Sequence, residues 1–121
     1  MLFIGATSGI GQSALQYFAQ HAPLSTHLHR RPPPPTVASH ENLLVSLRQS
    51  KPTGTYSLIT ADVSLVSEID KVVNAITQKE TKVDILFMSA GFMRFEGRKD
   101  TREGLDPSMT TRYYSRLRAV Q

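Results

Sequence analysis

Three glycines with a fixed spacing, Gly5, Gly9 and Gly11, follow a short apolar run at the start of the chain. The first permits a tight turn, the second lets the backbone approach a pyrophosphate because no Cβ intervenes, and the third lets a following helix pack closely on a sheet. The N–H groups at the start of such a helix, and the positive end of its dipole, attract phosphate. Thr7 and Ser8 add hydroxyl donors. We interpret the segment as a dinucleotide-phosphate site; the alternative is a glycine-rich turn that binds no ligand.

The choice between the two nicotinamide dinucleotides depends on the charge near the second expected strand. An acidic residue about 20 residues beyond the glycines hydrogen-bonds a free ribose 2′-hydroxyl and favours NAD. No acidic residue occurs between Gly11 and Glu41, and Arg30 and Arg31 occupy the region instead. Guanidinium groups bind a 2′-phosphate through paired hydrogen bonds, so the predicted cofactor is NADP(H). The alternative interpretation is that both arginines are solvated at the surface beside a loop.

Other candidate chemistry finds less support in the sequence. His27 and His29 alternate along one expected strand face, but the chain has no cysteine and no acidic residue nearby to complete a zinc site. We interpret both as solvated or packed histidines and predict no metal. Ser8 is not a nucleophile elbow, because Ala6 stands where the first glycine of that motif belongs.

Apolar periodicity predicts the elements that must position these residues. Short apolar runs followed by turn residues predict strands at 2–4, 26–29, 56–61 and 83–88. The first helix is expected to end near Pro23, and its apolar face is formed by Ile10, Ala14, Tyr17 and Phe18. The clearest helical spacing belongs to Ile69, Val72, Val73 and Ile76.

Capping residues predict where the helices begin. Ser39 is expected to cap the second helix after a proline-rich loop at 32–38, and Ser64 is expected to cap the third. Asp106 and Pro107 are typical of a cap followed by proline at the first helical position. That last helix is expected to bury an apolar stripe made of Met109, Tyr113, Leu117 and Val120.

Strands and helices alternate along the whole chain, beginning with a strand. This order predicts an α/β fold: a Rossmann-like parallel sheet with helices on both faces, truncated after the fourth strand and the helix that follows it. We expect residues 1–121 to form a single partial dinucleotide-binding domain.

The composition is that of a soluble globular protein, with 40% hydrophobic and 20% charged residues. No apolar run is long enough to cross a bilayer, and the first residues lack the features of a signal peptide. The net charge of +4 forms no continuous tract and is not interleaved with aromatic residues. We therefore expect no nucleic-acid partner, no membrane partner and a cytoplasmic location.

The glycine motif, Gly-x-x-x-Gly-Ile-Gly, resembles the first turn of the short-chain dehydrogenase/reductase family. Asp62-Val63 resembles the family's Asp-Val pair, whose carboxylate and backbone contact the adenine. The segment 88–91 resembles its Asn-Asn-Ala-Gly signature, with Met88 and Ser89 in place of both asparagines. The resemblance covers the N-terminal portion of the family. The glycine turn, the arginines and the resemblance together give these expected cofactor-binding residues: Gly5, Thr7, Ser8, Gly9, Ile10, Gly11, Arg30, Arg31, Asp62, Val63, Ser89, Ala90 and Gly91.

The same resemblance implies catalysis by a serine on a fifth strand and a Tyr-x-x-x-Lys on the next helix, and no such set occurs in these 121 residues. Tyr114 and Arg118 have the spacing but lie one helix too early, and arginine cannot replace the lysine. We therefore assign no catalytic residue and expect Tyr113 and Tyr114 to pack the last helix.

Two late stretches, 103–106 and 112–116, resemble fungal members of the family that act in secondary metabolism. The resemblance implies an NADP(H)-dependent oxidoreductase acting on a small-molecule carbonyl or alcohol, catalytically incomplete as this chain. The alternatives are a non-catalytic NADP(H)-binding module and a truncated gene remnant without function. In the family the last helix often lies at a dimer interface, so self-association through it is expected.

Overall fold

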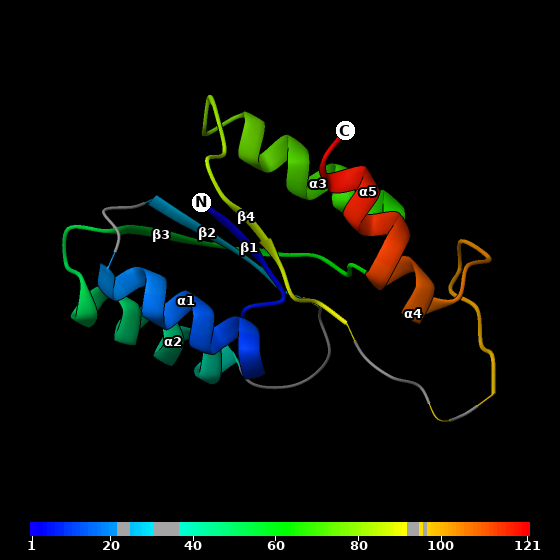
Figure 1. Cartoon of the computed structure of the whole chain (residues 1–121), viewed down its shortest axis with the longest axis horizontal. Helices are drawn as coiled ribbons and strands as arrows, with labels where there is room; N and C mark the ends of the chain where they lie inside the picture. Colours follow the sequence, from blue (N-terminus) through cyan, green and yellow to red (C-terminus); the bar gives the residue numbers. More distant parts are fainter. Residues whose placement is uncertain (22–24, 31–36, 92–94, 96) are drawn as a thin grey trace.

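A computed structural model of the protein describes residues 1–21, 25–30, 37–91, 95 and 97–121, and it shows a parallel sheet with helices on both faces (Figure 1). In chain order the elements are β1 (Leu2–Ile4), α1 (Gly9–His21), β2 (Ser25–Arg30), α2 (Val37–Ser50), β3 (Thr55–Thr60), α3 (Val66–Thr77), β4 (Leu86–Met88), α4 (Pro107–Met109), the π-helical turn η1 (Thr110–Tyr114) and α5 (Ser115–Ala119). Within these ranges, every helix falls short of the length or the apolar character that a bilayer crossing demands.

The strand order is β3-β2-β1-β4, and all pairs are parallel. Phe3 in the middle of β1 pairs with Leu28 of β2 on one side and with Phe87 of β4 on the other. Strands β2 and β3 are thus added on one side of β1, and the chain then crosses over so that β4 lies on the opposite side of β1. In sheets of this kind ligands bind outside the carboxyl ends of the strands at this reversal point, here between β1 and β4.

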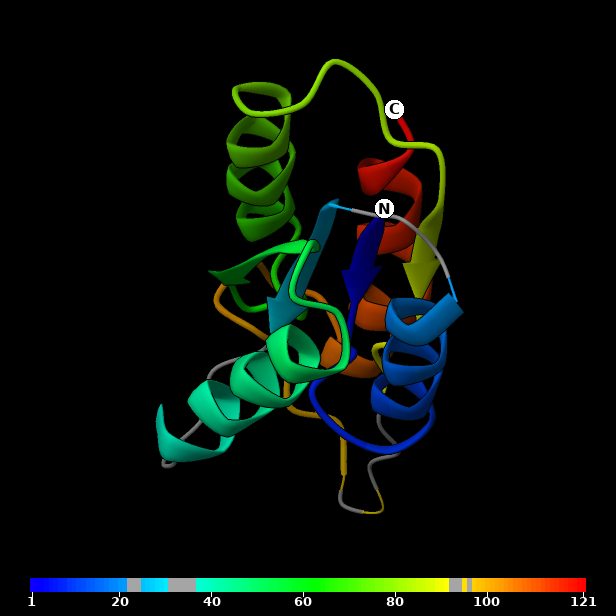
Figure 2. The same ribbon diagram turned by 90° about the vertical axis from the view of Figure 1, so that its left-hand side faces the viewer.

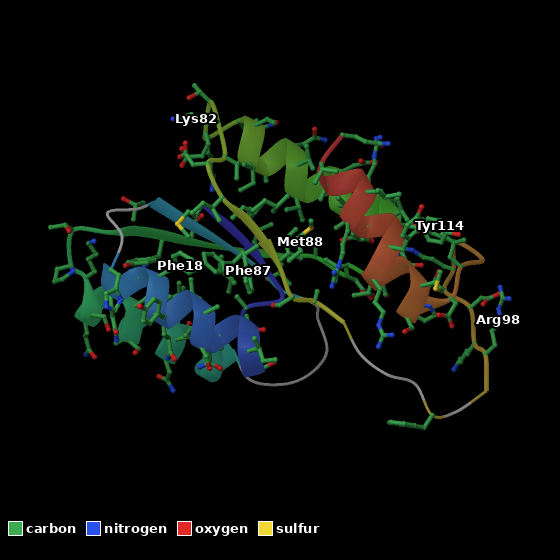
Figure 3. All side chains as sticks on the ribbon, in the orientation of Figure 1. Phe18, Lys82, Phe87, Met88, Arg98 and Tyr114 are labelled. Carbon is green, nitrogen blue, oxygen red and sulfur yellow. The ribbon has the colours of Figure 1, made fainter. Side chains whose placement is uncertain are left out.

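One face of the sheet is covered by α1 and α2 (Figure 2). The ring of Phe3 lies 5.9 Å from that of Phe18 on α1 and 5.3 Å from that of Phe87. Figure 3 shows the side chains of Phe18 and Phe87 in the layer between the sheet and α1. Leu15 and Leu47 complete this core and are fully buried. The aromatic cluster thus fixes α1, and with it the turn that begins the helix.

The other face is covered by α3 and α5, which pack against each other. Ile69, Val72 and Ile76 of α3 are buried against Leu2 and Ile4 of β1, which confirms the predicted apolar face of this helix. An exposed ion pair between Arg118 Nε and Asp70 Oδ1, 2.7 Å apart, also joins α5 to α3. The last helix is therefore anchored on the side of the sheet opposite α1.

The predicted apolar face of α1 was right for two of its four residues. Ala14 and Phe18 pack against the core, whereas Ile10 and Tyr17 are exposed. The buried residues of the helix are Gly11, Leu15 and Ala19. These three are spaced four apart, so they form one row along the helix. The close approach of Gly11 to the sheet sets the rotation of α1, and a hydrophobicity pattern does not register a glycine.

Two predicted caps were also wrong. Helix α2 begins at Val37, so Ser39 lies inside it and the predicted loop at 32–38 loses its last two residues to the helix. The cap of α3 is Leu65, with no side-chain hydrogen bond, while the Ser64 hydroxyl donates to Asp62 Oδ1 at 2.7 Å instead. A nearby carboxylate thus competes with the helix for this hydroxyl. Pro23 and residues 31–36 lie outside the described residues.

Strand β4 is shorter than the predicted 83–88, because it begins at Leu86. Among the described strands it pairs with β1 alone, and β1 has three residues, so there is little backbone to pair with. The Leu2 N–H donates to the Ile85 carbonyl at 2.8 Å, and the preceding Val83 is exposed. The length of β4 is therefore limited by its neighbour rather than by its own apolar run.

The last helix is the continuous run of α4, η1 and α5. It begins where it was predicted to begin, but it buries a different face from the predicted one. Asp106 accepts a hydrogen bond from the Met109 N–H at 2.9 Å, and Pro107 is the first helical residue. The predicted stripe of Met109, Tyr113, Leu117 and Val120 is exposed, and Tyr114 is exposed with it. The buried residues are Thr110, Thr111 and Ser115. A π-helical turn, closed by the Ser115 N–H on the Thr110 carbonyl, lies in this helix, and the Ser115 hydroxyl on its buried side donates to the Val63 carbonyl.

Candidate functional site

The turn after β1 is in direct contact with the segment after β4. Gly5 has φ +86°, a conformation that residues with a side chain rarely adopt. A Cβ placed on Gly5 would lie 2.4 Å from the backbone nitrogen of Ala90 and 2.5 Å from its Cα. Only a residue without a side chain can therefore occupy this position beside Ala90.

Gly11 brings the first turn of α1 equally close to the same two segments. A Cβ on Gly11 would lie 2.2 Å from Ser89 Oγ and 2.5 Å from the Gly5 carbonyl oxygen. The side-chain oxygen of Ser89 could rotate away, but the carbonyl is fixed in the backbone. The helix is thus seated on the turn as the glycine spacing predicts.

Hydrogen bonds from Ser89 and Ala90 join the ends of β1 and β4. The Ser89 and Ala90 N–H groups both donate to the Ile4 carbonyl, at 2.9 and 3.2 Å. The Ser89 hydroxyl donates to the Gly5 carbonyl at 3.0 Å. Ser89 therefore ties the glycine turn to the β4 end from a position where the family signature has asparagine.

The first turn of α1 is open to solvent. Ser8, Gly9 and Ile10 are exposed, and a Cβ on Gly9 would meet no atom of the described residues within 4 Å. The first N–H groups of a helix have no partner inside the helix, so at this exposed end they can bind an anion. Thr7 lies beside them and is half-buried. Among the described residues, the positions predicted to bind phosphate are therefore accessible from solvent.

Asp62 and Val63 follow β3 and are held by hydrogen bonds at both residues. The Asp62 carboxylate accepts from the Ser64 N–H at 2.9 Å and from the Ser64 hydroxyl. Val63 is buried, and its carbonyl accepts from the Ser115 hydroxyl at 2.8 Å. The backbone of this segment is therefore fixed from two directions.

Arg30 is the last residue of β2, where it pairs with Thr60. Because β2 lies next to β1 and runs parallel to it, this position is at the same edge of the sheet as the glycine turn. Arg31 lies outside the described residues. The cofactor choice therefore stays a prediction from the sequence.

His27 and His29 lie within β2, where they pair with β1 and β3. Across the described part of the chain, no group of three or more His, Asp or Glu side chains is placed to hold a metal ion.

Two donors on the last helix reach the site and were missed from the sequence. The Ser115 hydroxyl binds the Val63 carbonyl, and Arg116 Nη2 donates to the Ala90 carbonyl at 3.1 Å. The apolar stripe that includes Tyr113 and Leu117 predicted that a different face of this helix would be buried. Polar residues in such a helix carry no local signal that they reach another segment.

A third missed residue, Glu103, caps α3 from the loop before the last helix. Its carboxylate accepts from the N–H groups of Val66 at 2.7 Å and Ser67 at 3.1 Å, and from the Ser67 hydroxyl. Partial burial favours a higher pKa for Glu103, but the hydrogen bonds from Ser67 and Val66 outweigh it and lower the pKa. The carboxylate thus neutralises the positive end of α3 directly beyond Asp62 and Val63.

Replacing Glu103 with glutamine is expected to lower the free energy of unfolding by about 1 kcal/mol at neutral pH, because the charged cap of α3 is lost. The lowered pKa means that the carboxylate contributes fully above the pKa of an unfolded glutamate. This contribution is lost as the pH falls through the still lower pKa of the folded state. Urea unfolding of the wild type and Glu103→Gln across the acid range measures the difference.

The matched control is Glu41→Gln, which removes an exposed charge from α2. Its effect is expected to stay within about 0.5 kcal/mol. An equal loss in both variants, or a Glu103 effect that persists at strongly acid pH, would contradict the cap.

Three comparisons with known proteins agree with this geometry. The family model described as short chain dehydrogenase matches residues 1–114. The NmrA-like family domain-containing oxidoreductase notO of Aspergillus sp. (strain MF297-2) is 69% identical over 120 residues, covering 99% of this chain and 36% of that protein. The chain spans about a third of the length of the curated relatives it matches.

Two solved structures share the fold. A short-chain dehydrogenase from Sphingobium yanoikuyae in complex with NADPH has a TM-score of 0.75 at 23% identity, and the match covers 98% of this chain and 44% of that one. The NADH-dependent reductase A1-R′ complexed with NAD has a TM-score of 0.74 at 23% identity, and the match covers 98% and 48%.

Proposed function

The chain belongs to the short-chain dehydrogenase family, and from this premise we propose that it provides the NADP(H)-binding part of an oxidoreductase that interconverts a carbonyl compound and an alcohol. The observation that carries the proposal is the seating of Gly5 and Gly11 against Ser89 and Ala90 at the reversal point of the sheet. We call the glycine turn at 5–11, together with residues 62–63 and 89–91, the cofactor cradle. A side chain at Gly5 or Gly11 would collide with its backbone, whereas the exposed Gly9 leaves the start of α1 open to a pyrophosphate.

Each part of the cradle has a proposed task. The N–H groups at the start of α1 bind the pyrophosphate, and Thr7 and Ser8 supply additional donors. Asp62 and Val63 hold the adenine side, and the backbone at 89–91 lines the nicotinamide side. When bound, the nicotinamide supplies or accepts the hydride.

The preference for NADP(H) rests on Arg30 and Arg31 and on the absence of any acid between Gly11 and Glu41. A guanidinium group suits a 2′-phosphate, while an acid in this region would suit the free hydroxyl of NAD. The similar structures include one complex with NADPH and one with NAD, so both cofactors fit this fold. The arginines are what favour NADP(H) in this chain.

Calorimetric titration with NADPH and NADH tests the proposal. NADPH is expected to bind at least about tenfold more tightly, because one or two charge-assisted hydrogen bonds are added. Equal affinities would contradict the NADP(H) assignment alone. Failure of both cofactors to bind would contradict the proposed function and favour a gene remnant.

A second candidate is a binding module without chemistry, and the absence of Tyr-x-x-x-Lys from these 121 residues favours it for the chain by itself. Carbonyl reduction is proposed for the whole protein. The 121-residue chain is expected to show no NADPH-dependent carbonyl reduction, whereas the product of the complete gene is expected to show it. Turnover by the 121-residue chain alone would contradict this division.

The proposed setting is fungal secondary metabolism in the cytoplasm, and the similarity to an Aspergillus oxidoreductase supports the fungal part. Deletion of the gene is expected to leave a carbonyl or alcohol intermediate unconverted, which comparison of culture extracts would detect.

Self-association through the last helix is also proposed, because its apolar stripe is exposed, with Val120 at 63% and Tyr113 at 53%. A second copy of the chain would cover this stripe. Leu117→Asp places a charge in the stripe and is expected to reduce the sedimenting mass by half. Val45→Asp on α2, another exposed apolar residue, is the control. An unchanged mass would contradict the interface.

A further inference from the structure

Two consecutive residues on the last helix bind carbonyls from two different strand ends. The Ser115 hydroxyl donates to the Val63 carbonyl, after β3, at 2.8 Å. Arg116 Nη2 donates to the Ala90 carbonyl, after β4, at 3.1 Å. These strands are the two outer members of the sheet, so no backbone pairing fixes one end against the other.

The helical geometry explains how neighbours can reach separate segments. Successive side chains on a helix point about 100° apart, so Ser115 and Arg116 diverge from one point on the backbone. A π-helical turn lies immediately before them and is closed by the Ser115 N–H on the Thr110 carbonyl. The helix thus acts as a brace between Val63 and Ala90.

Ser115 is buried and Arg116 is half-buried. Ser115 is only 3% exposed. Beside it lies a small apolar cavity lined by Ile4, Val63, Met88, Ala90, Ser115 and Arg116. Within the described part of the chain, Arg116 Nε is buried without a hydrogen-bond partner. Burying Arg116 Nε without a hydrogen bond is energetically unfavourable. The hydrogen bond from Nη2 to the Ala90 carbonyl is the compensating interaction, and it restrains the backbone at Ala90.

We propose that Ser115 and Arg116 are positioning residues that hold the two backbone segments of the cofactor cradle at a fixed separation. Ser115 fixes the adenine side through Val63, and Arg116 fixes the nicotinamide side through Ala90. The inference rests on the proposed function, because it assigns those sides from the NADP(H) site. Neither residue touches the cofactor in this proposal.

The test uses Ser115→Ala and Arg116→Met in the product of the complete gene. Two matched controls are Thr110→Val, which removes a buried hydroxyl bonded within its own helix to the Asp106 carbonyl, and Arg118→Met, which removes the exposed pair with Asp70. Affinity is measured for NADPH and for its adenine half, 2′-phospho-ADP-ribose. Thermal unfolding of every variant is recorded in parallel.

The brace predicts a separate effect at each end. Ser115→Ala is expected to weaken NADPH and the adenine half equally, by about fivefold, since one neutral hydrogen bond is lost. Arg116→Met is expected to weaken NADPH by about tenfold and the adenine half by less than about twofold. Arg116→Lys keeps a donor and is expected to restore part of the affinity. A role in stability alone would move the two affinities of Arg116→Met together, and it would give Ser115→Ala no larger loss of affinity than a control with an equal fall in unfolding temperature.

Hydrogen exchange without cofactor tests the brace even if the proposed function fails. In Arg116→Met the Ser89 and Ala90 amides, which bind the Ile4 carbonyl, are expected to exchange about tenfold faster than in Arg118→Met. In Ser115→Ala the same is expected for the Leu65 amide, which binds the Asp62 carbonyl. Unchanged rates at both sites would overturn the brace. Faster exchange in a protein that binds neither cofactor would support the brace and refute the proposed function.

Discussion

Gly5→Ala is expected to lower the free energy of unfolding by about 3 kcal/mol and to weaken NADPH binding by more than about tenfold. Two costs combine at this position. The φ of +86° is strained for alanine, and the new Cβ would lie 2.4 Å from the Ala90 nitrogen. Because that atom belongs to the backbone, relief requires the β1 and β4 ends to separate. The same separation would displace the turn on which the pyrophosphate is proposed to lie.

Gly104→Ala and Gly97→Ala separate the two costs. Gly104 has φ +71°, but a Cβ there would meet no atom within 4 Å in the described part of the chain, so this variant carries the backbone strain alone, about 1 kcal/mol. Gly97 has no positive φ, and a Cβ there would likewise meet no described atom within 4 Å, so its replacement is expected to be neutral within about 0.5 kcal/mol. Urea unfolding and NADPH titration measure both effects. If Gly5→Ala lost no more stability than Gly104→Ala, the close contact with Ala90 would be refuted.

The double variant Arg30→Ala with Arg31→Ala is expected to weaken NADPH by about ten- to a hundredfold while NADH changes by less than about twofold. The reason is that the arginines are proposed to bind the 2′-phosphate, which NADH lacks. Arg30 ends β2 at the sheet edge that carries the glycine turn, as this task requires. Competitive titration with both cofactors gives the two ratios.

Arg48→Ala is the control for a general loss of positive charge, since this arginine is exposed in the last turn of α2. It is expected to leave both affinities unchanged. A parallel loss of NADPH and NADH affinity in the double variant would show that the arginines support the fold or the pyrophosphate rather than the 2′-phosphate. Unchanged affinity for both cofactors would show that Arg30 and Arg31 do not bind the cofactor and would favour the alternative that they are solvated at the surface.

Local signals were sufficient for much of the architecture. The apolar run at 2–4, the helical spacing of Ile69, Val72 and Ile76, and the cap formed by Asp106 and Pro107 all correspond to observed elements. Each depends on residues within one or two turns of each other, so sequence spacing contains the relevant geometry. The alternation of these elements then favours a parallel sheet over other arrangements.

Helix faces and element lengths required the tertiary structure. The stripe of Met109, Tyr113 and Leu117 has helical periodicity, yet the helix buries Thr110 and Ser115. A periodic pattern shows that one side of a helix differs from the other, but the contacts with distant segments such as Val63 decide which side is buried. The length of β4 likewise depends on β1, a strand more than eighty residues earlier.

The glycine turn could be predicted from residue types, because the freedom from a Cβ that it requires belongs to Gly5, Gly9 and Gly11 themselves. The hydrogen bonds of Ser89 and Ala90 to the end of β1 became visible in the folded chain. The tertiary structure also brought Glu103, Ser115 and Arg116 back to the α3 start and the two strand ends. The physical reason is that a hydrogen bond between distant segments depends on their positions in space, and neither partner's local sequence encodes the other.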